Sequence, residues 1–535
     1  MVKRFIIILA VLAYGPVMGL RAQGLTQETF KIGKTLALLE AIYVDSVDIS
    51  AIAEQMIITT LRNLDPHSVY IPAKDVQEER EPLQGNFEGV GIQFNVLNDT
   101  ILIISPTPGG PSEKVGIQAG DRIITIGDEK VTGIGMSATG VQKRLRGPKG
   151  TTVVVTIYRK GVNDLLEFTI TRDKIPLTSL DAAYMISDGV GYIKLSRFAE
   201  QTAVEFEEAV EKLRLARMES LIIDLRGNSG GYMVPAVQIA DELLPMEELI
   251  VYIEGVHTSR QEYRSTPSGT LTRAKIAVLI DEGSASASEI LAGAVQDWDR
   301  GVVIGRRSFG KGLVQNGFPL PDGSEIRLTI ARYFTPSGRS IQTPYNEGFD
   351  KYFQTYYTRY FNGELIHPDS LNLPDSLKAY TITNKRLVYG GGGITPDIFI
   401  PIDTTYYSDY YRDLIRTSTL INFMIAYTDR NRKDLTRRYK TFERFSKEFT
   451  FDDETIKALV AAGEKNKVMF DQAQFDVSAP ELKKVMKGLV ARDLWDMNEY
   501  YMVVNEDDYA IVRALSILND QSLYERLLGF RKELK

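Results

Sequence analysis

Residues 276–315 read IAVLIDEGSASASEILAGAVQDWDRGVVIGRRSFGKGLVQ, and their pattern predicts a strand, a tight turn and the start of a helix. The run 276–280 is short, apolar and rich in β-branched residues, which is typical of a buried strand. A turn with glycine and serine follows at 281–284, and helical spacing begins at Ala285 and continues to Trp298. Residues on either side, from about 174 to 404, also alternate between strand and helix patterns. The sequence therefore predicts an α/β core built around this unit.

A serine stands at the predicted strand-to-helix turn. Ser286 and Glu289 have the spacing of a capping box, a common structural reason for a serine at a helix start. A catalytic role would require a base to take the proton of the hydroxyl. None of the three histidines, His67, His257 and His367, lies in a glycine-rich, strand-bounded setting, and the chain has no cysteine.

Lysine is the remaining candidate for that base. Lys311 lies between two glycines, directly before an apolar segment. Burial there would lower the pKa of the amine and leave it neutral, so that it could accept a proton. If the segment is a strand, Gln315 shares a face with Lys311 and can hold its amine. The alternative is that Lys311 is an ordinary surface charge.

Taken together, residues 284–290 and 310–315 resemble the C-terminal processing peptidases, also called tail-specific proteases, with the spacing between serine and lysine that this family has. The resemblance implies a serine endopeptidase that forms an acyl-enzyme with a Ser/Lys dyad. It makes Ser286 the nucleophile, Lys311 the general base and Gln315 the residue that orients the lysine. It also implies a crotonase-like α/β protease core with an inserted, mostly β PDZ domain, in a multidomain α/β fold with helical N- and C-terminal segments.

A second motif supports this resemblance. Residues 226–231, Arg-Gly-Asn-Ser-Gly-Gly, follow a predicted buried strand and resemble a family motif in which proline is frequent where Ser229 stands here. Acyl transfer places negative charge on the substrate oxygen, and fixed backbone N–H groups can stabilise that charge. By resemblance, the donors are the backbone N–H of Ala287 and an N–H of the Gly230-Gly231 turn.

From residue 86 to 173 the pattern changes to short strands with glycine turns, and the motifs at 87–94, 116–126 and 145–151 resemble those of a PDZ domain. Such domains bind an extended peptide by strand addition and hold its terminal carboxylate with backbone N–H groups. The expected peptide groove consists of Gly89, Val90, Gly91, Ile92, Val141 and Leu145. For the last two, a role only in the domain core is the alternative. Arg146 matches a family arginine that couples the PDZ domain to the active site.

The remaining segments are predicted from composition. Residues 1–22 have a basic start and an apolar run, as in a signal peptide, with an N-terminal membrane anchor as the alternative. A helical segment is expected at 23–85, the protease core at 174–404 with a surface insertion at 345–379, and a charged helical extension at 405–535. Export and the family resemblance together predict a periplasmic enzyme.

Composition and motifs also define the expected partners. The net charge of −7 gives no sign of nucleic-acid binding. No metal or other cofactor is expected. The expected partners are protein or peptide substrates with free C-termini, a second copy bound through the helical segments, and an adaptor or regulator bound to the extension. A non-catalytic PDZ scaffold and a ligand carrier on the same core are the alternatives to an enzyme.

Overall fold

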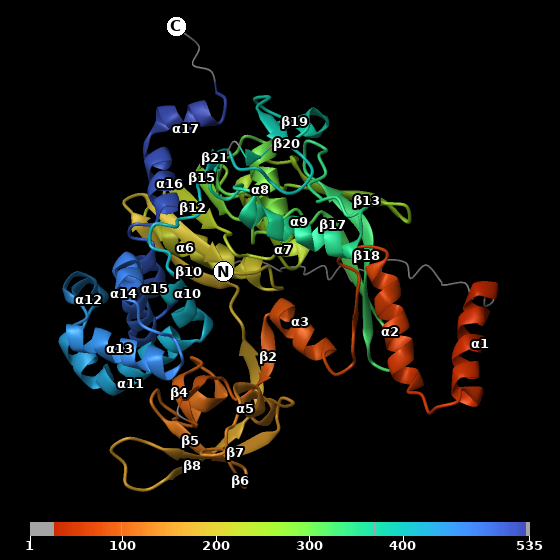
Figure 1. Cartoon of the computed structure of the whole chain (residues 1–535). Helices are drawn as coiled ribbons and strands as arrows, with labels where there is room; N and C mark the ends of the chain where they lie inside the picture. Colours follow the sequence, from red (N-terminus) through yellow and green to blue (C-terminus); the bar gives the residue numbers. More distant parts are fainter. Residues whose placement is uncertain (1–25, 98, 368–369, 372, 531–535) are drawn as a thin grey trace, which may run out of the picture.

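The computed structural model describes residues 26–530, apart from 98, 368–369 and 372. A central α/β body carries a β-rich domain at residues 86–176 below it and a helical bundle at its side (Figure 1). This is the multidomain α/β fold with helical ends that the sequence predicted. The predicted signal peptide at 1–22 lies outside the described residues. Within them, no helix is both long and apolar enough to cross a bilayer.

The central sheet has the strand order β10-β11-β12-β15-β16-β21. Its strands are β10 (Leu180–Ser187), β11 (Val190–Leu195), β12 (Ser220–Asp224), β15 (Lys275–Ile280), β16 (Val302–Gly305) and β21 (Ile398–Phe399). All neighbours are parallel except β10 and β11. Helices α6 (Thr202–Leu215), α7 (Met233–Leu243) and α8 (Ala287–Asp297) share one hydrophobic core with this sheet. Strands alternating with helices produce this layering, because each crossover helix buries its apolar stripe on the sheet.

The other face of the central sheet is covered by the end of the chain. Helices α16 (Tyr509–Asn519) and α17 (Gln521–Leu527) form a second core cluster with strands β10, β11, β12, β15 and β16. Ala514 and Ile517 of α16 are fully buried there. The segment expected as an extension from residue 405 therefore contributes its last helices to the protease core itself.

The first part of that segment forms a separate helical bundle with its own hydrophobic cluster. Its helices are α10 (Asp409–Arg416), α11 (Thr419–Arg438), α12 (Phe442–Glu448), α13 (Asp453–Lys465), α14 (Gln472–Leu494) and α15 (Met497–Val504). Aspartate or serine side chains cap α10, α13, α14, α15 and α16. These caps satisfy N–H groups that a helix start leaves without partners.

A second sheet lies beside the core and contains β1 (Val69–Ile71), β13 (Leu249–Gly255), β14 (Thr258–Arg264), β17 (Leu313–Pro319) and β18 (Glu325–Phe334). Strands β17 and β18 form a hairpin, and β1 pairs with β18. The segment before β1 therefore lies beside the hairpin. Helices α1 (Gln27–Ile42) and α2 (Ile49–Arg62) precede it.

The segment expected as a surface insertion packs closely on the core. It contains α9 (Phe349–Phe361), a 3₁₀ turn (Asp375–Leu377) and the strand pair β19 (Lys378–Tyr380) and β20 (Leu387–Tyr389). Tyr352 and Arg359 of α9 are buried. Arg359 pairs with Glu364 and donates to the carbonyl of Ser308, three residues before Lys311 in the chain. The insertion thus supports the loop that leads to the predicted base.

The β-rich domain has a sheet of order β3-β4-β5-β7-β8, with β6 paired to β5. Its elements are β3 (Ile92–Leu97), β4 (Thr100–Pro106), α4 (Pro111–Lys114), β5 (Arg122–Ile126), β6 (Glu129–Lys130), α5 (Ala138–Leu145), β7 (Thr152–Tyr158) and β8 (Leu166–Thr171). Strands β2 (Asn86–Gly89) and β9 (Asp173–Pro176) pair where the chain enters and leaves this domain.

Two elements outside this domain hold it against the rest of the molecule. Helix α3 (Val76–Gln84) connects β1 with β2. On the far side, Asp429 of α11 pairs with Arg122 of β5 at 2.7 Å, and Asn422 accepts from Asn95 of β3 at 2.9 Å. Asn95, Leu102 and Arg122 oppose one another across three strands, so they share one sheet face, and α11 lies on it.

Candidate active site

Ser286 lies at a strained point of the backbone between β15 and α8. Its φ is +53° and its ψ is −112°, a combination that residues with a side chain rarely adopt. Such a conformation costs about 1–3 kcal/mol and persists only where surrounding contacts enforce it. A sharp turn from strand to helix presents a serine side chain at the end of the sheet, as the nucleophile turn of α/β-hydrolases does.

The turn at 226–231 lies directly against Ser286. A side chain at Gly230 would place its Cβ 2.8 Å from Ser286 Cβ and 3.0 Å from the nitrogen of Ala287, so only glycine fits. At Gly231 a Cβ would lie 2.1 Å from the carbonyl oxygen of Phe198. The structure therefore brings together Ser286, Ala287, Gly230 and Gly231, and the two glycines are what permit this close approach.

The N–H groups of this turn differ in availability. Gly230 donates to Asn228 Oδ1 at 2.9 Å. In residues 26–530 as described, the N–H groups of Ala287 and Gly231 have no acceptor. The N–H groups of Ala287 and Gly231 are thus both open to an acceptor, while Gly230 makes the close approach to Ser286.

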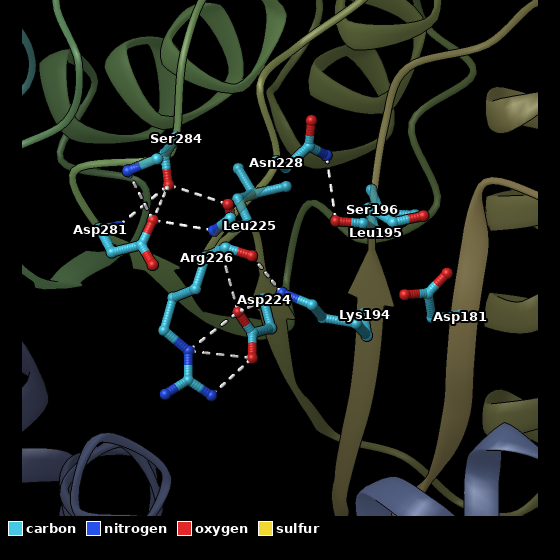
Figure 2. Close-up of polar contacts among 12 residues, drawn as sticks. Asp181, Lys194, Leu195, Ser196, Asp224, Leu225, Arg226, Asn228, Asp281 and Ser284 are labelled. Atoms are coloured by element: carbon cyan, nitrogen blue, oxygen red, sulfur yellow. Dashed lines mark hydrogen bonds and ion pairs between the residues drawn. The ribbon is translucent and has the colours of Figure 1, made fainter. Parts of the chain in front are cut away.

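A hydrogen-bond network fixes the two turns to each other (Figure 2). The side chain of Asn228 donates to the carbonyl of Leu195 at 3.0 Å, and Gly227 donates to Asp281 Oδ1 at 2.8 Å. Ser284 Oγ donates to the carbonyl of Leu225 at 2.8 Å. Because each bond joins different strands, the position of the glycine turn relative to Ser286 is set by the sheet.

Lys311 lies in the loop just before β17 and donates from Nζ to Gln315 Oε1 at 2.8 Å. Burial lowers the pKa of this amine below its usual value, and the positive charge of Arg327 lowers it further. The charges of Glu289 and Asp65 act in the opposite direction. Gln315 does reach Lys311, although Lys311 precedes the strand and the β17–β18 register shifts at Gln315.

Gln315 is held from its other side by His67. The side-chain amide of Gln315 donates to the carbonyl of His67. The backbone N–H of His67 donates in turn to Asp65 Oδ1 at 2.8 Å. The His67 ring bonds to the hydroxyl of Tyr352 at 2.9 Å. Burial, followed by the charge of Lys311, lowers the pKa of His67 to about 4, so the ring is neutral at physiological pH.

Glu289 joins Ser286 to Lys311. Its Oε2 accepts from the backbone N–H of Ser286 at 2.8 Å and from that of Lys311 at 2.9 Å. Its Oε1 accepts from Ser308 Oγ at 2.6 Å and from the Gly310 N–H at 2.7 Å. Burial raises the pKa of Glu289 to about 7, although these four donors favour the charged form.

Tyr333 makes the same connection from the opposite side. Its hydroxyl lies 2.7 Å from the carbonyl oxygen of Lys311 and 3.1 Å from that of Ser286. The described structure has no hydrogen bond between Ser286 Oγ and Lys311 Nζ. The two residues are joined through their backbones, by Glu289 and Tyr333. Such catalytic bonds often form only when substrate is present.

Sequence reasoning gave these supporting residues little weight. From the sequence, Glu289 is only half of a capping box, and His67 lies outside the glycine-rich, strand-bounded setting expected of a base. The spacing of Glu289 from Ser286 was a usable signal, because a carboxylate that caps this turn must lie beside the nucleophile. The contacts of His67 and Tyr333 cross more than 20 positions of sequence, and local patterns do not show such contacts.

The predicted peptide groove lies around β3. This strand is at the end of its sheet, with one edge unpaired among the described residues, and Gly91 next to it has a φ of +69°. Val141 and Leu145 of α5 are 0% and 3% exposed and belong to the domain core. Their part in peptide binding stays a prediction. Arg146 follows α5, pairs with Glu81 of α3 at 2.6 Å and lies over the Phe87 ring.

Comparison with known proteins agrees with this arrangement. Residues 189–348 match the model of peptidase family S41, and residues 89–170 match that of the PDZ domain. Residues 410–496 match a family of unknown function, DUF8443.

Several relatives are carboxy-terminal processing proteases. CtpB of Bacillus subtilis is 37% identical over 317 residues, which are 58% of this chain and 65% of CtpB. The carboxy-terminal-processing protease of Bartonella bacilliformis is 35% identical over 355 residues, 64% of this chain and 81% of that protein. The solved photosystem II D1 C-terminal processing protease is 29% identical, with a TM-score of 0.35, covering 59% of this chain and 84% of its own.

The Bartonella relative is matched over most of its length, and the catalytic core and PDZ models match in the order that the sequence motifs predicted. The chain therefore belongs to the carboxy-terminal processing proteases of peptidase family S41, a family of serine-type peptidases.

Proposed function

We propose that the protein is an exported serine endopeptidase that recognises the C-termini of its substrates through the PDZ domain and cleaves them with Ser286 and Lys311. The observation that carries the proposal is the strained Ser286, which lies beside two open N–H donors and shares Glu289 with a partly buried lysine. The export part rests on the pattern of residues 1–22.

In the proposed reaction, the neutral amine of Lys311 takes the proton of Ser286 Oγ as this oxygen attacks the scissile carbonyl carbon. The carbonyl oxygen becomes negatively charged and accepts from the N–H groups of Ala287 and Gly231. When the tetrahedral intermediate collapses, the Lys311 ammonium returns the proton to the leaving amine. Water then attacks the acyl-enzyme with Lys311 again as the base, and Lys311 returns this proton to Ser286 Oγ as the bond between that oxygen and the acyl carbon breaks and the acid product leaves.

Gln315 orients the base in this proposal. Its Oε1 accepts from Lys311 Nζ, and its amide N–H donates to the carbonyl of His67. The side chain of Gln315 therefore cannot rotate without losing a hydrogen bond. A lone pair of the neutral amine then remains for the proton of Ser286. The PDZ part of the proposal is supported by the open edge of β3 and by the glycine turn at 89–91.

The test is substitution of each member of the dyad. We expect Ser286→Ala and Lys311→Ala each to lower the turnover of an unstructured peptide by about 10⁴-fold or more, with the double variant scarcely worse, because such residues act as a unit. Circular dichroism and thermal unfolding check that each variant is folded. Substantial turnover by folded Ser286→Ala would refute the proposal.

A further inference from the structure

A buried ion cluster lies beneath the turn that carries Gly230 and Gly231. Asp224, at the end of β12, is 1% exposed, and its carboxylate accepts from the hydroxyl of Tyr192 at 2.9 Å. It also accepts from Lys194 at 3.2 Å and from the Arg226 guanidinium at 2.7 Å (Figure 2). Burial alone would raise the pKa of Asp224, but the charges of Arg226 and Lys194 hold it below its usual range. Asp224 is therefore ionised.

Arg226 connects this cluster to the glycine turn. Its backbone N–H donates to Asp224 at 2.9 Å, its guanidinium folds back to the same carboxylate, and its carbonyl accepts from Lys194. Arg226 is also the first residue of the turn at 226–231. The direction in which the turn leaves the sheet thus depends on how this side chain is held.

The second carboxylate on Arg226 comes from the C-terminal helices. Asp508 Oδ2 accepts from Arg226 Nη1 at 2.9 Å, while its Oδ1 caps α16 by accepting from the Ile511 N–H at 3.0 Å. With Asp508 the cluster has two cations and two anions. Without Asp508, Asp224 would be the one carboxylate left for both Lys194 and Arg226. One of the two positive charges would then lack a carboxylate at a largely buried site.

The geometry of the turn leaves little tolerance for a shift of Arg226. Gly230 lies within contact distance of Ser286, and the open N–H of Gly231 follows it directly. Errors of about 1 Å in the position of a catalytic group can cost about 10²-fold in rate. A change at Arg226 would be transmitted through only four residues to that donor.

We propose that Asp508 is a positioning residue of the active site: the C-terminal helices hold Arg226 and thereby the N–H of Gly231 that faces the substrate oxygen. This inference rests on the proposed function of Ser286. It gives the C-terminal segment a part in the reaction, in addition to covering the central sheet.

The variant that tests the proposal is Asp508→Asn, because asparagine keeps the helix cap and removes the charge. The matched control is Asp520→Asn. Asp520 caps α17 by accepting from the Leu523 N–H at 2.9 Å and has no ion pair among the described residues. If Asp508→Asn does not fold, Asp508→Ser also keeps a capping oxygen and removes the charge.

We expect Asp508→Asn to lower kcat about tenfold or more with little change in KM, since complete loss of one oxyanion donor costs about 10²–10³ in kcat. The rate at which a fluorophosphonate probe labels Ser286 should fall in parallel, because the phosphonyl oxygen needs the same donors. The midpoint of thermal unfolding should be lower than that of Asp520→Asn, because one cation loses its carboxylate, but it should stay well above the assay temperature.

Values of kcat and labelling rate within twofold of those of Asp520→Asn would overturn the inference, as would a loss confined to thermal stability. Ser286→Ala, assayed alongside, tests the proposed function separately. If that variant is inactive and Asp508→Asn behaves like its control, only the inference about Asp508 fails.

Discussion

At the scale of single residues, the state of the Lys311 amine decides whether the proposed reaction can start. Burial and the charge of Arg327 lower its pKa, whereas Glu289 and Asp65 raise it. Arg327 itself is one-quarter exposed and pairs with Glu79 at 3.6 Å. As pH falls through the lowered pKa, Lys311 gains a proton and can no longer act as a base. Activity should therefore be lost on the acid side.

The contribution of Arg327 gives a test of this assignment. Arg327→Gln removes a positive charge near Lys311, so the pKa of the amine should rise, and the acid limb of the kcat/KM profile should move to higher pH. Activity should fall at neutral pH and recover in more alkaline buffer. The control is Arg332→Gln, an exposed arginine on the same strand. If the acid limb of the kcat/KM profile of Arg327→Gln lies at the same pH as that of the unmodified protein, the role of Lys311 as base is contradicted.

At the scale of elements, α3 connects the PDZ domain with the second sheet, which contains β17 and β18. Glu81 pairs with Arg146 at the end of α5, while Arg80 pairs with Glu325 and Glu79 with Arg327 on β18. Glu81 is buried, so its pair with Arg146 is less screened by solvent than an exposed pair. A peptide in the groove can alter catalysis only if it favours one arrangement of these contacts over another.

We therefore expect Arg146→Ala to lower turnover of a free-acid peptide towards that of the same peptide with an amidated C-terminus, while peptide binding changes little. The unmodified protein should cleave the free acid faster, because the amide lacks the carboxylate that PDZ domains bind. Arg144→Ala is the matched control, since Arg144 pairs with Glu129 inside the PDZ domain. Equal rates for both peptides would refute gating by the carboxylate, and a fully active Arg146→Ala would exclude this residue.

At the scale of the whole molecule, the two ends of the chain make unequal contributions. Helices α16 and α17 bury one face of the central sheet, and Tyr524 bonds to the N–H of Ile276 in β15 at 3.0 Å. Helix α1, by contrast, has no buried residue. The fold of the catalytic strands should thus depend on the C-terminal helices and not on α1.

Deletion of residues 509–535 should expose the apolar face of the sheet and give aggregated or unfolded protein. Deletion of residues 26–42 should leave the unfolding midpoint and peptide turnover close to those of the full chain. Size-exclusion chromatography and thermal unfolding measure both outcomes. A monomeric, cooperatively folded protein without residues 509–535 would show that the second face needs no cover.

The sequence alone determined the local framework of this protein. The apolar run at 276–280, the turn after it and the helical spacing from Ala285 predict the unit that carries Ser286, and the motifs around Lys311 and at 226–231 identify the family. These features can be predicted from the sequence because strands, turns and helix starts depend on neighbouring residues. The predicted roles of Ser286, Lys311, Gln315 and Arg146 stay predictions until the variants above are measured.

Only the tertiary structure decided which distant groups support these residues. In the folded protein, Glu289 accepts from the backbone N–H groups of both Ser286 and Lys311. The Gln315 amide donates to the carbonyl of His67, and the Gly230 N–H donates to Asn228. The tertiary structure also laid the end of the chain on the central sheet and Asp508 on Arg226. An apolar face in a sequence shows that a surface will be buried, but the segment that buries it is chosen by packing across the whole chain.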